Sequence, residues 1–239
     1  MEITKITKPA RRLLKLKYCG AVIVAAGSAQ RMGGTDKILA DLGGVPVVLH
    51  AIREFQKCDA IREIVVVTRE DLLTRIMGMC ANLDKVTAVV VGGKDRKESV
   101  WLGLNALSAK VKLAAIHDGA RPLISWQVID RAVRAANTFG AAAPAVPVKD
   151  TIKVVNGGIV KETPERKNLY AVQTPQVFDV ALLRGALKKA AEEEAAITDD
   201  CSAVERMGMS VKIVEGDERN LKITTPMDLA VARMLLEEQ

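Results

Sequence analysis

The sequence predicts an α/β fold in which helices cover both faces of a doubly wound, mostly parallel sheet. Short runs of β-branched and other apolar residues alternate along the chain with stretches of helical period. Within these runs successive positions are apolar, as expected for strands that are buried on both faces. The chain has 239 residues, of which 49% are hydrophobic, and this is enough for the core of one large domain.

The first predicted strand, residues 21–24, leads into a loop of small residues followed by two cations. The small residues are Ala25, Ala26 and Gly27, and the cations are Arg31 and Lys37. Accessible backbone N–H groups beside fixed positive charge suit a polyphosphate, although many α/β turns look similar. The loop lacks the glycine patterns of dinucleotide-binding proteins and of P-loop ATPases. It is therefore a candidate nucleotide site of a different kind.

The remaining elements follow in order. Buried strands are predicted at residues 64–67, 86–91, 113–116 and 141–146. Pro144 and Pro147 indicate that the last of these is irregular or ends at an edge. Helices are predicted at residues 47–57, 70–80, 96–107 and 125–137, the last with Ser125 as its N-cap. Further helices are predicted at 180–195, after Asp199 and from Pro226, with strands at 211–214 and 221–224 between them.

The alternation of strand and helix patterns stops at residues 150–170, which predict a projecting β-hairpin arm. Two short β-type runs, 152–155 and 159–160, flank Gly157 and Gly158. An arm with little apolar cover is usually stabilised from outside its own domain, which hints at a partner subunit. A solvated hairpin without a role fits the same pattern equally well.

Composition and charge exclude several classes of function. The net charge is +6, but the basic residues are dispersed apart from residues 8–17, and only 3% of residues are aromatic. Nucleic acid is therefore not the expected partner, and a small anionic substrate explains the charge. The four cysteines lie far apart without a C-x-x-C pair, so we expect reduced thiols in the cytoplasm. Residues 1–18 form a basic extension, which we do not interpret as a secretory signal, and no membrane span is expected.

Three polar positions stand where such a sheet would place a site. Asp118 follows strand 113–116, where a carboxylate can hold the Mg²⁺ of a nucleoside triphosphate or cap the next turn. Gly93 and Ser99 follow strand 86–91, as a loop that reads a base edge or as a simple turn. Lys222 lies in a predicted strand, where it either meets an anion such as phosphate or points to solvent at an edge. His117 is interpreted as structural.

Taken in order, these motifs resemble the 2-C-methyl-D-erythritol 4-phosphate cytidylyltransferase family. The resemblance runs from about residue 20 to the C-terminus and includes residues 25–27, Arg31, Met32 and Lys37, followed by 92–96, 99–100, 117–122, 147–153, 174–176, 198–200, 214–216 and 220–224. It implies a single Rossmann-like nucleotidyltransferase domain at residues 19–239. That domain would bind CTP with Mg²⁺ or another divalent cation. The phosphate of methylerythritol phosphate would attack the α-phosphorus and release pyrophosphate, in isoprenoid precursor synthesis.

The resemblance also implies roles for individual residues. Arg31, Lys37 and Lys222 would be the catalytic cations. The nucleotide would be surrounded by Ala25, Ala26, Gly27, Gly93, Ser99, Asp118 and Ala120, with Asp118 also at the metal. The acceptor would meet Arg121, Thr151, Arg166, Thr198 and Thr224. The arm, residues 148–172, would reach across a homodimer and place Arg166 in the neighbouring subunit's site.

The chain departs from the family pattern at Lys94, where an acidic residue is frequent, and at Asp36, where proline is common. A cytidylyltransferase for ribitol or ribulose 5-phosphate is the nearer alternative, and Thr151, Lys153 and Arg166 favour methylerythritol phosphate over it. A non-catalytic nucleotide-binding module is the more distant alternative. The full set of charges around one phosphorus argues against it.

Overall fold

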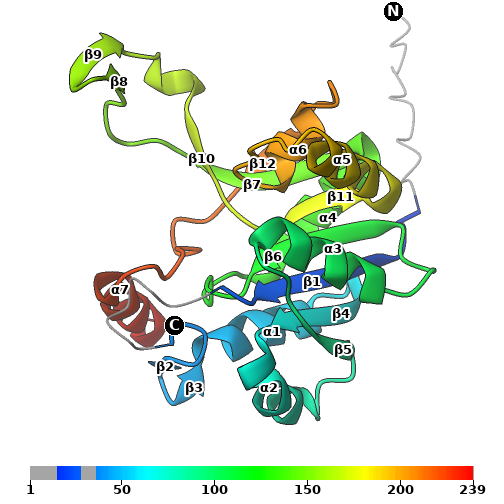
Figure 1. The fold of residues 1–239 in the computed structure, drawn as a ribbon. Helices are drawn as coiled ribbons and strands as arrows, with labels where there is room; N and C mark the ends of the chain where they lie inside the picture. Colours follow the sequence, from blue (N-terminus) through cyan, green and yellow to red (C-terminus); the bar gives the residue numbers. More distant parts are fainter. Residues whose placement is uncertain (1–14, 28–35, 239) are drawn as a thin grey trace, which may run out of the picture.

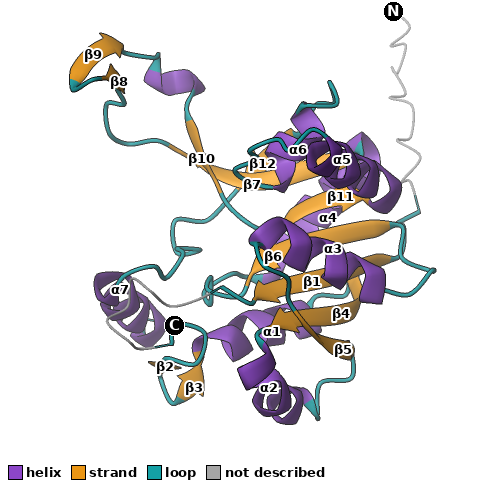
Figure 2. Cartoon of the chain, in the orientation of Figure 1, coloured by secondary structure: helices purple, strands orange, loops and turns teal. Residues whose placement is uncertain are grey.

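The computed structural model describes residues 15–27 and 36–238, and its central feature is an eight-stranded sheet (Figures 1 and 2). The strand order is β10-β7-β11-β6-β1-β4-β5, with β12 beside β7. β1, β4, β5 and β6 are mutually parallel, whereas β10 and β11 run antiparallel to β7. The strands are β1 Cys19–Ala25, β4 Ile61–Thr68, β5 Val86–Val91, β6 Leu113–Asp118, β7 Ala141–Pro147, β10 Tyr170–Val172, β11 Gln176–Asp179 and β12 Lys212–Glu215. The mostly parallel sheet is confirmed, and the antiparallel β10 and β11 are additions to it.

Helices cover both faces of the sheet, as predicted. They are α1 Val47–Lys57, α2 Leu73–Cys80, α3 Arg96–Ala106, α4 Trp126–Phe139, α5 Val180–Glu192, α6 Asp200–Glu205 and α7 Pro226–Glu237. A 3₁₀ turn, Glu70–Leu72, precedes α2. Residues of α1, α2 and α4 pack on one face with Ile23, and residues of α3, α5 and α6 pack on the other with Val22. Adjacent strand positions are therefore apolar because each faces a different core.

β7 is an interior strand as far as Ala145, which the prediction from its prolines did not anticipate, whereas Val146 and Pro147 pair only with β10, so the strand ends at an edge as predicted. Ala142 pairs with Val177 of β11 on one side and with Lys212 of β12 on the other. Proline has no N–H to donate to a neighbouring strand. Pro144 is tolerated in β7 because the antiparallel neighbour is interrupted beside it, between the end of β10 and the start of β11. The carbonyl of Pro144 still accepts a hydrogen bond from the N–H of Gln173 at 2.8 Å.

Residues 221–224 form no strand, in contrast to the prediction. Ile223 is fully buried, and its N–H donates to the carbonyl of Ala120 at 2.8 Å. It packs in a small third cluster with Leu229 of α7 and with Leu42, part of a short hairpin formed by β2 Asp41–Leu42 and β3 Val45–Pro46. Burial of Ile223 therefore fixes this irregular segment, and with it Lys222, against the end of β6.

Two further details differ from the prediction. β5 lies at the end of the sheet, so its side chains are half-buried or exposed and not fully buried. Ser125 occupies the N-cap position of α4 but makes no side-chain capping bond. The N–H of Trp126 donates instead to the carboxylate of Glu54 at 3.2 Å.

The predicted arm projects from the body of the molecule (Figure 1). Its tip is the hairpin of β8 Val154–Asn156 and β9 Ile159–Glu162, joined by Gly157 and Gly158, whose φ angles are +57° and +79°. Positive φ at both turn positions matches the twist of the flanking strands and favours glycine. Every residue of both strands is exposed, so the arm has no cover from its own domain.

All four cysteines are buried and unpaired. Burial raises the pKa of each thiol, to about 11 for Cys80. Within residues 15–27 and 36–238, no helix combines the length and the apolar character that a membrane crossing requires.

Candidate active site

A cavity of about 370 Å³ opens at the carboxyl ends of the parallel strands, where open α/β sheets bind their ligands. Five separate parts of the chain meet there: the end of β1, the turn after residue 36, the β5–α3 loop, the end of β6 and the segment before α7. The lining residues are Val24, Ala26, Gly27, Lys37, Ile38, Gly93, Lys94, Asp95, Arg96, Ser99, Asp118, Ala120 and Lys222. A larger hollow of about 1050 Å³ beside α1 and α4 contains none of the described candidate residues.

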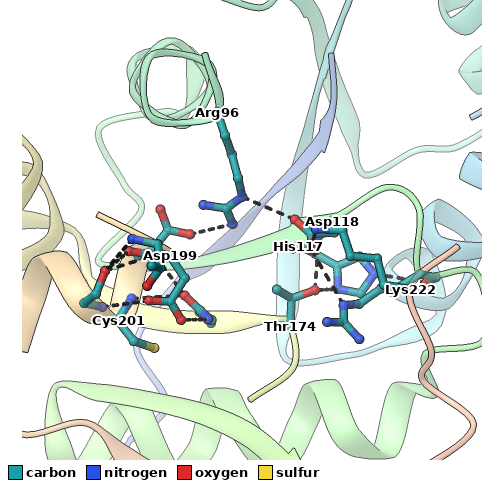
Figure 3. A network of polar contacts seen from close by, with 12 residues as sticks. Arg96, His117, Asp118, Thr174, Asp199, Cys201 and Lys222 are labelled. Carbon is teal, nitrogen blue, oxygen red and sulfur yellow. Dashed lines mark hydrogen bonds and ion pairs between the residues drawn. The ribbon is translucent and has the colours of Figure 1, made fainter. Parts of the chain in front are cut away.

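Asp118, the last residue of β6, is surrounded by three cations (Figure 3). Lys222 Nζ lies 2.9 Å from Oδ2, Arg96 Nε lies 3.3 Å from Oδ1, and Arg121 Nε lies 3.7 Å from Oδ2. Burial would raise the pKa of Asp118, but the charges of Arg96, Lys222 and Arg121 outweigh it and hold that pKa well below its usual range. The carboxylate is therefore ionised at neutral pH, and positive charge exceeds negative charge around it.

His117 and Thr174 position Asp118 from behind. The Asp118 N–H donates to Thr174 Oγ1 at 3.1 Å, and Thr174 Oγ1 lies 2.9 Å from His117 Nδ1. His117 Nε2 lies 3.2 Å from the carbonyl of Arg121, which assigns the proton to Nε2 and makes Nδ1 the acceptor. Burial lowers the pKa of His117 to about 4, so the ring is neutral. This fully buried histidine is structural, as predicted.

Arg96 links the cavity to a second carboxylate that the sequence analysis did not single out. Its Nη2 lies 2.8 Å from Asp200 Oδ2, while its Nε contacts Asp118. Asp200 is fully buried at the start of α6, and burial raises its pKa in spite of Arg96. The sequence spacing contains no signal for this pair, because residues 96 and 200 meet only when α3 packs against α5 and α5 packs against α6.

The β5–α3 loop is shaped by close packing and by Ser99. A Cβ on Gly92 would stand 2.4 Å from Ala26 Cβ and 2.8 Å from Ser99 Oγ, so no side chain fits there. Ser99 Oγ accepts from the Gly93 N–H at 3.1 Å and donates to the carbonyl of Asp95 at 2.8 Å. Asp95 in turn caps α3 by accepting from the Glu98 N–H at 2.8 Å. These contacts place the loop backbone beside the end of β1.

The cavity brings together many of the residues that the sequence singled out. Those that line it are Ala26, Gly27, Lys37, Gly93, Ser99, Asp118, Ala120 and Lys222. Ala25 is buried beneath the lining. Arg121 is mostly buried behind Asp118, and its Nη1 donates to the carbonyl of Asn220 at 2.7 Å. Arg31 lies outside the described residues.

None of the predicted acceptor residues lines this cavity. Thr151 and Arg166 lie exposed on the arm, where Arg166 Nη1 donates to the carbonyl of Lys149 at 2.9 Å. Thr198 is exposed before α6. The Thr224 hydroxyl donates to Asp228 Oδ2 at 2.7 Å and so belongs to the N-terminus of α7.

The sequence pattern left open whether Lys222 meets an anion or points to solvent, and the structure shows that it meets an anion. It lines the cavity with a side chain that is 39% exposed, and its anion within the chain is Asp118. A half-exposed lysine that shares its carboxylate with two arginines can exchange this partner for a ligand phosphate at low cost.

A doubly wound sheet with a cation-lined cavity at its strand ends is the architecture of α/β proteins that bind nucleotides and other phosphorylated ligands. The comparisons with known proteins identify the family within this class. The chain belongs to the 2-C-methyl-D-erythritol 4-phosphate cytidylyltransferase family, whose model matches residues 19–238.

Curated relatives and solved structures agree with this assignment. The 2-C-methyl-D-erythritol 4-phosphate cytidylyltransferase of Caldanaerobacter subterraneus is 43% identical over 228 residues, which cover 91% of this chain and 98% of the relative. That of Halalkalibacterium halodurans is 45% identical, with 91% and 96% covered. The crystal structure of 4-diphosphocytidyl-2C-methyl-D-erythritol synthase from Anaerococcus prevotii has a TM-score of 0.86 at 31% identity, with 93% of this chain and 100% of that chain covered.

Proposed function

We propose that this chain transfers CMP from CTP to 2-C-methyl-D-erythritol 4-phosphate. A phosphate oxygen of the acceptor forms a bond to the α-phosphorus of CTP. The bond from that phosphorus to the β-phosphate oxygen breaks, and pyrophosphate leaves with its electron pair. Beside the family assignment, the observation that carries this proposal is the convergence of Lys37, Arg96 and Lys222 at one cavity at the strand ends.

The chain's own groups serve this reaction by positioning and by electrostatics. The backbone at Ala26, Gly27 and Gly93 borders the nucleotide, and Ser99 holds that loop in place. Lys37 and Lys222 neutralise the triphosphate and stabilise the charge that develops on the transferring group, together with Arg31. Because the attacking oxygen already belongs to a phosphate dianion, no protein nucleophile is required.

We propose that Mg²⁺, or another divalent cation, enters the cavity bound to CTP. Mg²⁺ favours one or two carboxylates together with phosphate oxygens. Asp118 offers one ionised carboxylate at the lining, and the described residues contain no cluster of three or more His, Cys, Asp or Glu side chains that could hold a metal alone. Titration with Mn²⁺ should therefore show tight binding only when CTP is present, and Asp118→Asn should weaken it.

The arm is proposed to act across a homodimer. Its exposed apolar side chains give a second subunit a surface to cover, and an isolated two-stranded hairpin is marginally stable in water. These side chains are Ile152, Val154, Val155, Ile159 and Val160. In this arrangement Arg166 and Thr151 bind the acceptor phosphate in the partner's site. The buried, unpaired cysteines suit the reducing cytoplasm.

The decisive test of the reaction is pyrophosphate release from CTP and Mg²⁺ with a panel of acceptors. Methylerythritol phosphate should be turned over far faster than ribitol 5-phosphate or ribulose 5-phosphate. A preference for either pentose compound would replace the proposed acceptor. Measurable CTP binding without turnover of any acceptor would replace the enzyme by a nucleotide-binding module.

The arm is tested by mixing two variants that should each be strongly impaired, Arg166→Ala and Lys37→Ala. A mixed dimer holds one site with an intact Lys37 and the intact Arg166 of the other subunit. Statistical mixing should restore about a quarter of the wild-type activity. Mixed dimers that form and stay inactive would refute the contribution of Arg166 across the dimer.

A further inference from the structure

Arg69, the residue after β4, links two segments that border the active-site cavity. Its Nη2 forms a short ion pair with Asp36 Oδ2, and its Nη1 reaches the carbonyl of Gly27 at 3.5 Å. Its Nε also lies 3.0 Å from Asp71 Oδ1. The Arg69 and Asp36 side chains are 25% and 23% exposed, which shields their ion pair from much of the solvent.

Asp36 connects Arg69 to Lys37, because it pairs with Arg69 and directly precedes Lys37 in the chain. Its Oδ1 accepts from the Ile38 N–H at 2.9 Å, and its carbonyl accepts from the Leu39 N–H at 3.1 Å. One aspartate therefore closes the turn that contains Lys37 and ties that turn to Arg69.

Gly27, the other residue that Arg69 contacts across the cavity border, lies close to the Lys37 ammonium group. The Lys37 Nζ is 4.0 Å from the point where a Cβ on Gly27 would stand, and both residues line the cavity. Arg69 thus contacts Gly27, which is close to the Lys37 ammonium group, and Asp36, which precedes Lys37 in the chain.

We propose that Arg69 is a positioning residue for Lys37. Through Asp36 and Gly27 it holds the Lys37 turn against the strand ends, so that Nζ stays in the cavity. The inference rests on the proposed function, in which Lys37 binds the triphosphate. Lysine has a long, flexible side chain, so a fixed backbone limits the positions that its ammonium group can reach. A displacement of about 1 Å in such a group can cost about 100-fold in rate.

A double-mutant cycle of Arg69→Ala and Lys37→Ala separates this role from a general structural one. In the wild-type background, Arg69→Ala should lower kcat/KM for CTP about 10-fold or more. In the Lys37→Ala background the same change should cost less than about 2-fold, because the group that it positions is gone. Equal losses in the two backgrounds, or a negligible loss in the wild-type background, would overturn the proposal.

Matched variants sharpen the cycle. Asp71→Asn removes the charge of the more exposed partner of Arg69, which lies outside the Lys37 turn, and should leave activity unchanged. Asp36→Asn keeps an oxygen for the Ile38 N–H but loses the ion pair, so it should reproduce the loss seen for Arg69→Ala. Arg69→Lys should recover part of the activity. If Arg69→Ala fails to fold, Asp36→Asn takes its place in the cycle, with the same two outcomes.

Failure of the reaction itself is distinguishable from failure of this inference. If the wild-type protein binds CTP but releases no pyrophosphate, the proposed function is wrong. The same cycle is then measured on the Kd for CTP, where the non-additive pattern supports the positioning role and an additive pattern refutes it.

Discussion

Lys222→Ala tests the proposed reaction most directly, because the structure gives separate magnitudes for its effects on stability and on rate. The Lys222 side chain is 39% exposed. When the lysine is removed, Asp118 still has Arg96 and Arg121 as ion-pair partners. The lost ion pair is screened by solvent, so we expect it to cost about 0–1 kcal/mol of unfolding free energy. For a chain of this size that lowers Tm by at most about 4 °C.

The expected effect on the rate is much larger. A preorganised group that stabilises charge in the transition state contributes about 3–4 kcal/mol, or 100- to 1000-fold in kcat. Lys222→Ala should therefore lower pyrophosphate release by at least about 100-fold while the protein stays folded. Initial rates at saturating CTP and acceptor, together with thermal unfolding of the same samples, measure both effects.

Lys17→Ala is the matched control. Lys17 is also a half-exposed lysine, 43% exposed, and it forms an ion pair with Asp179 at 3.2 Å. Its removal should change Tm to a similar extent without changing the rate. A Lys222→Ala enzyme with a rate close to wild type, or a Lys17→Ala enzyme that is equally slow, would refute the reasoning.

Three further outcomes are expected. His117 has a pKa of about 4 in the folded protein and about 6.5 in the unfolded chain. The wild-type protein should therefore lose about 2 kcal/mol of unfolding free energy between pH 7 and pH 5, whereas His117→Gln should not. An equal change in urea stability for both proteins over this pH range would contradict this. Asp118→Asn should cost about 3 kcal/mol of unfolding free energy at pH 7, because Lys222 and Arg121 lose their carboxylate partner and Arg96 loses one of its two. The difference from wild type in urea unfolding should shrink below about pH 4, where the unfolded carboxyl group also binds a proton. Gly92→Ala should abolish CTP binding in calorimetry, because a Cβ there collides with Ala26 and Ser99. Gly78→Ala, in open space on α2, should keep CTP binding and gain about 0.5–1 kcal/mol of unfolding free energy. Normal CTP binding by Gly92→Ala would contradict the close packing of the β5–α3 loop.

The sequence predicts most of the fold, because its strands are buried on both faces and its helices show a clear period. It does not predict β10 and β11, each of three or four residues, because such short strands leave little pattern in a window of sequence. It also misassigns residues 221–224, where an apolar alternation arises from the burial of Ile223 in a small cluster and not from a strand. The interior position of residues 141–145 depends on three neighbouring strands that lie farther along the chain, so the prolines predict the edge at the end of β7 but not its interior part.

The candidate site is predicted in its positions more than in its contacts. Strand ends identify Asp118 and the small-residue loop, since these follow from topology. The partners of Asp118 do not follow, because Arg96 and Lys222 reach it through packing between segments that are distant in sequence. The same limit applies to Asp200 and Arg69, whose contacts involve residues more than thirty positions away.

The four buried cysteines make the native protein a convenient background for site-specific chemistry. Their thiols are protonated at neutral pH and shielded from solvent, so maleimides and similar reagents should leave the folded chain unmodified. A single cysteine introduced at the exposed tip of the arm would then be the sole reactive thiol. A fluorophore or spin label attached there would report on the distance between the arms of the proposed homodimer, without prior removal of any native residue.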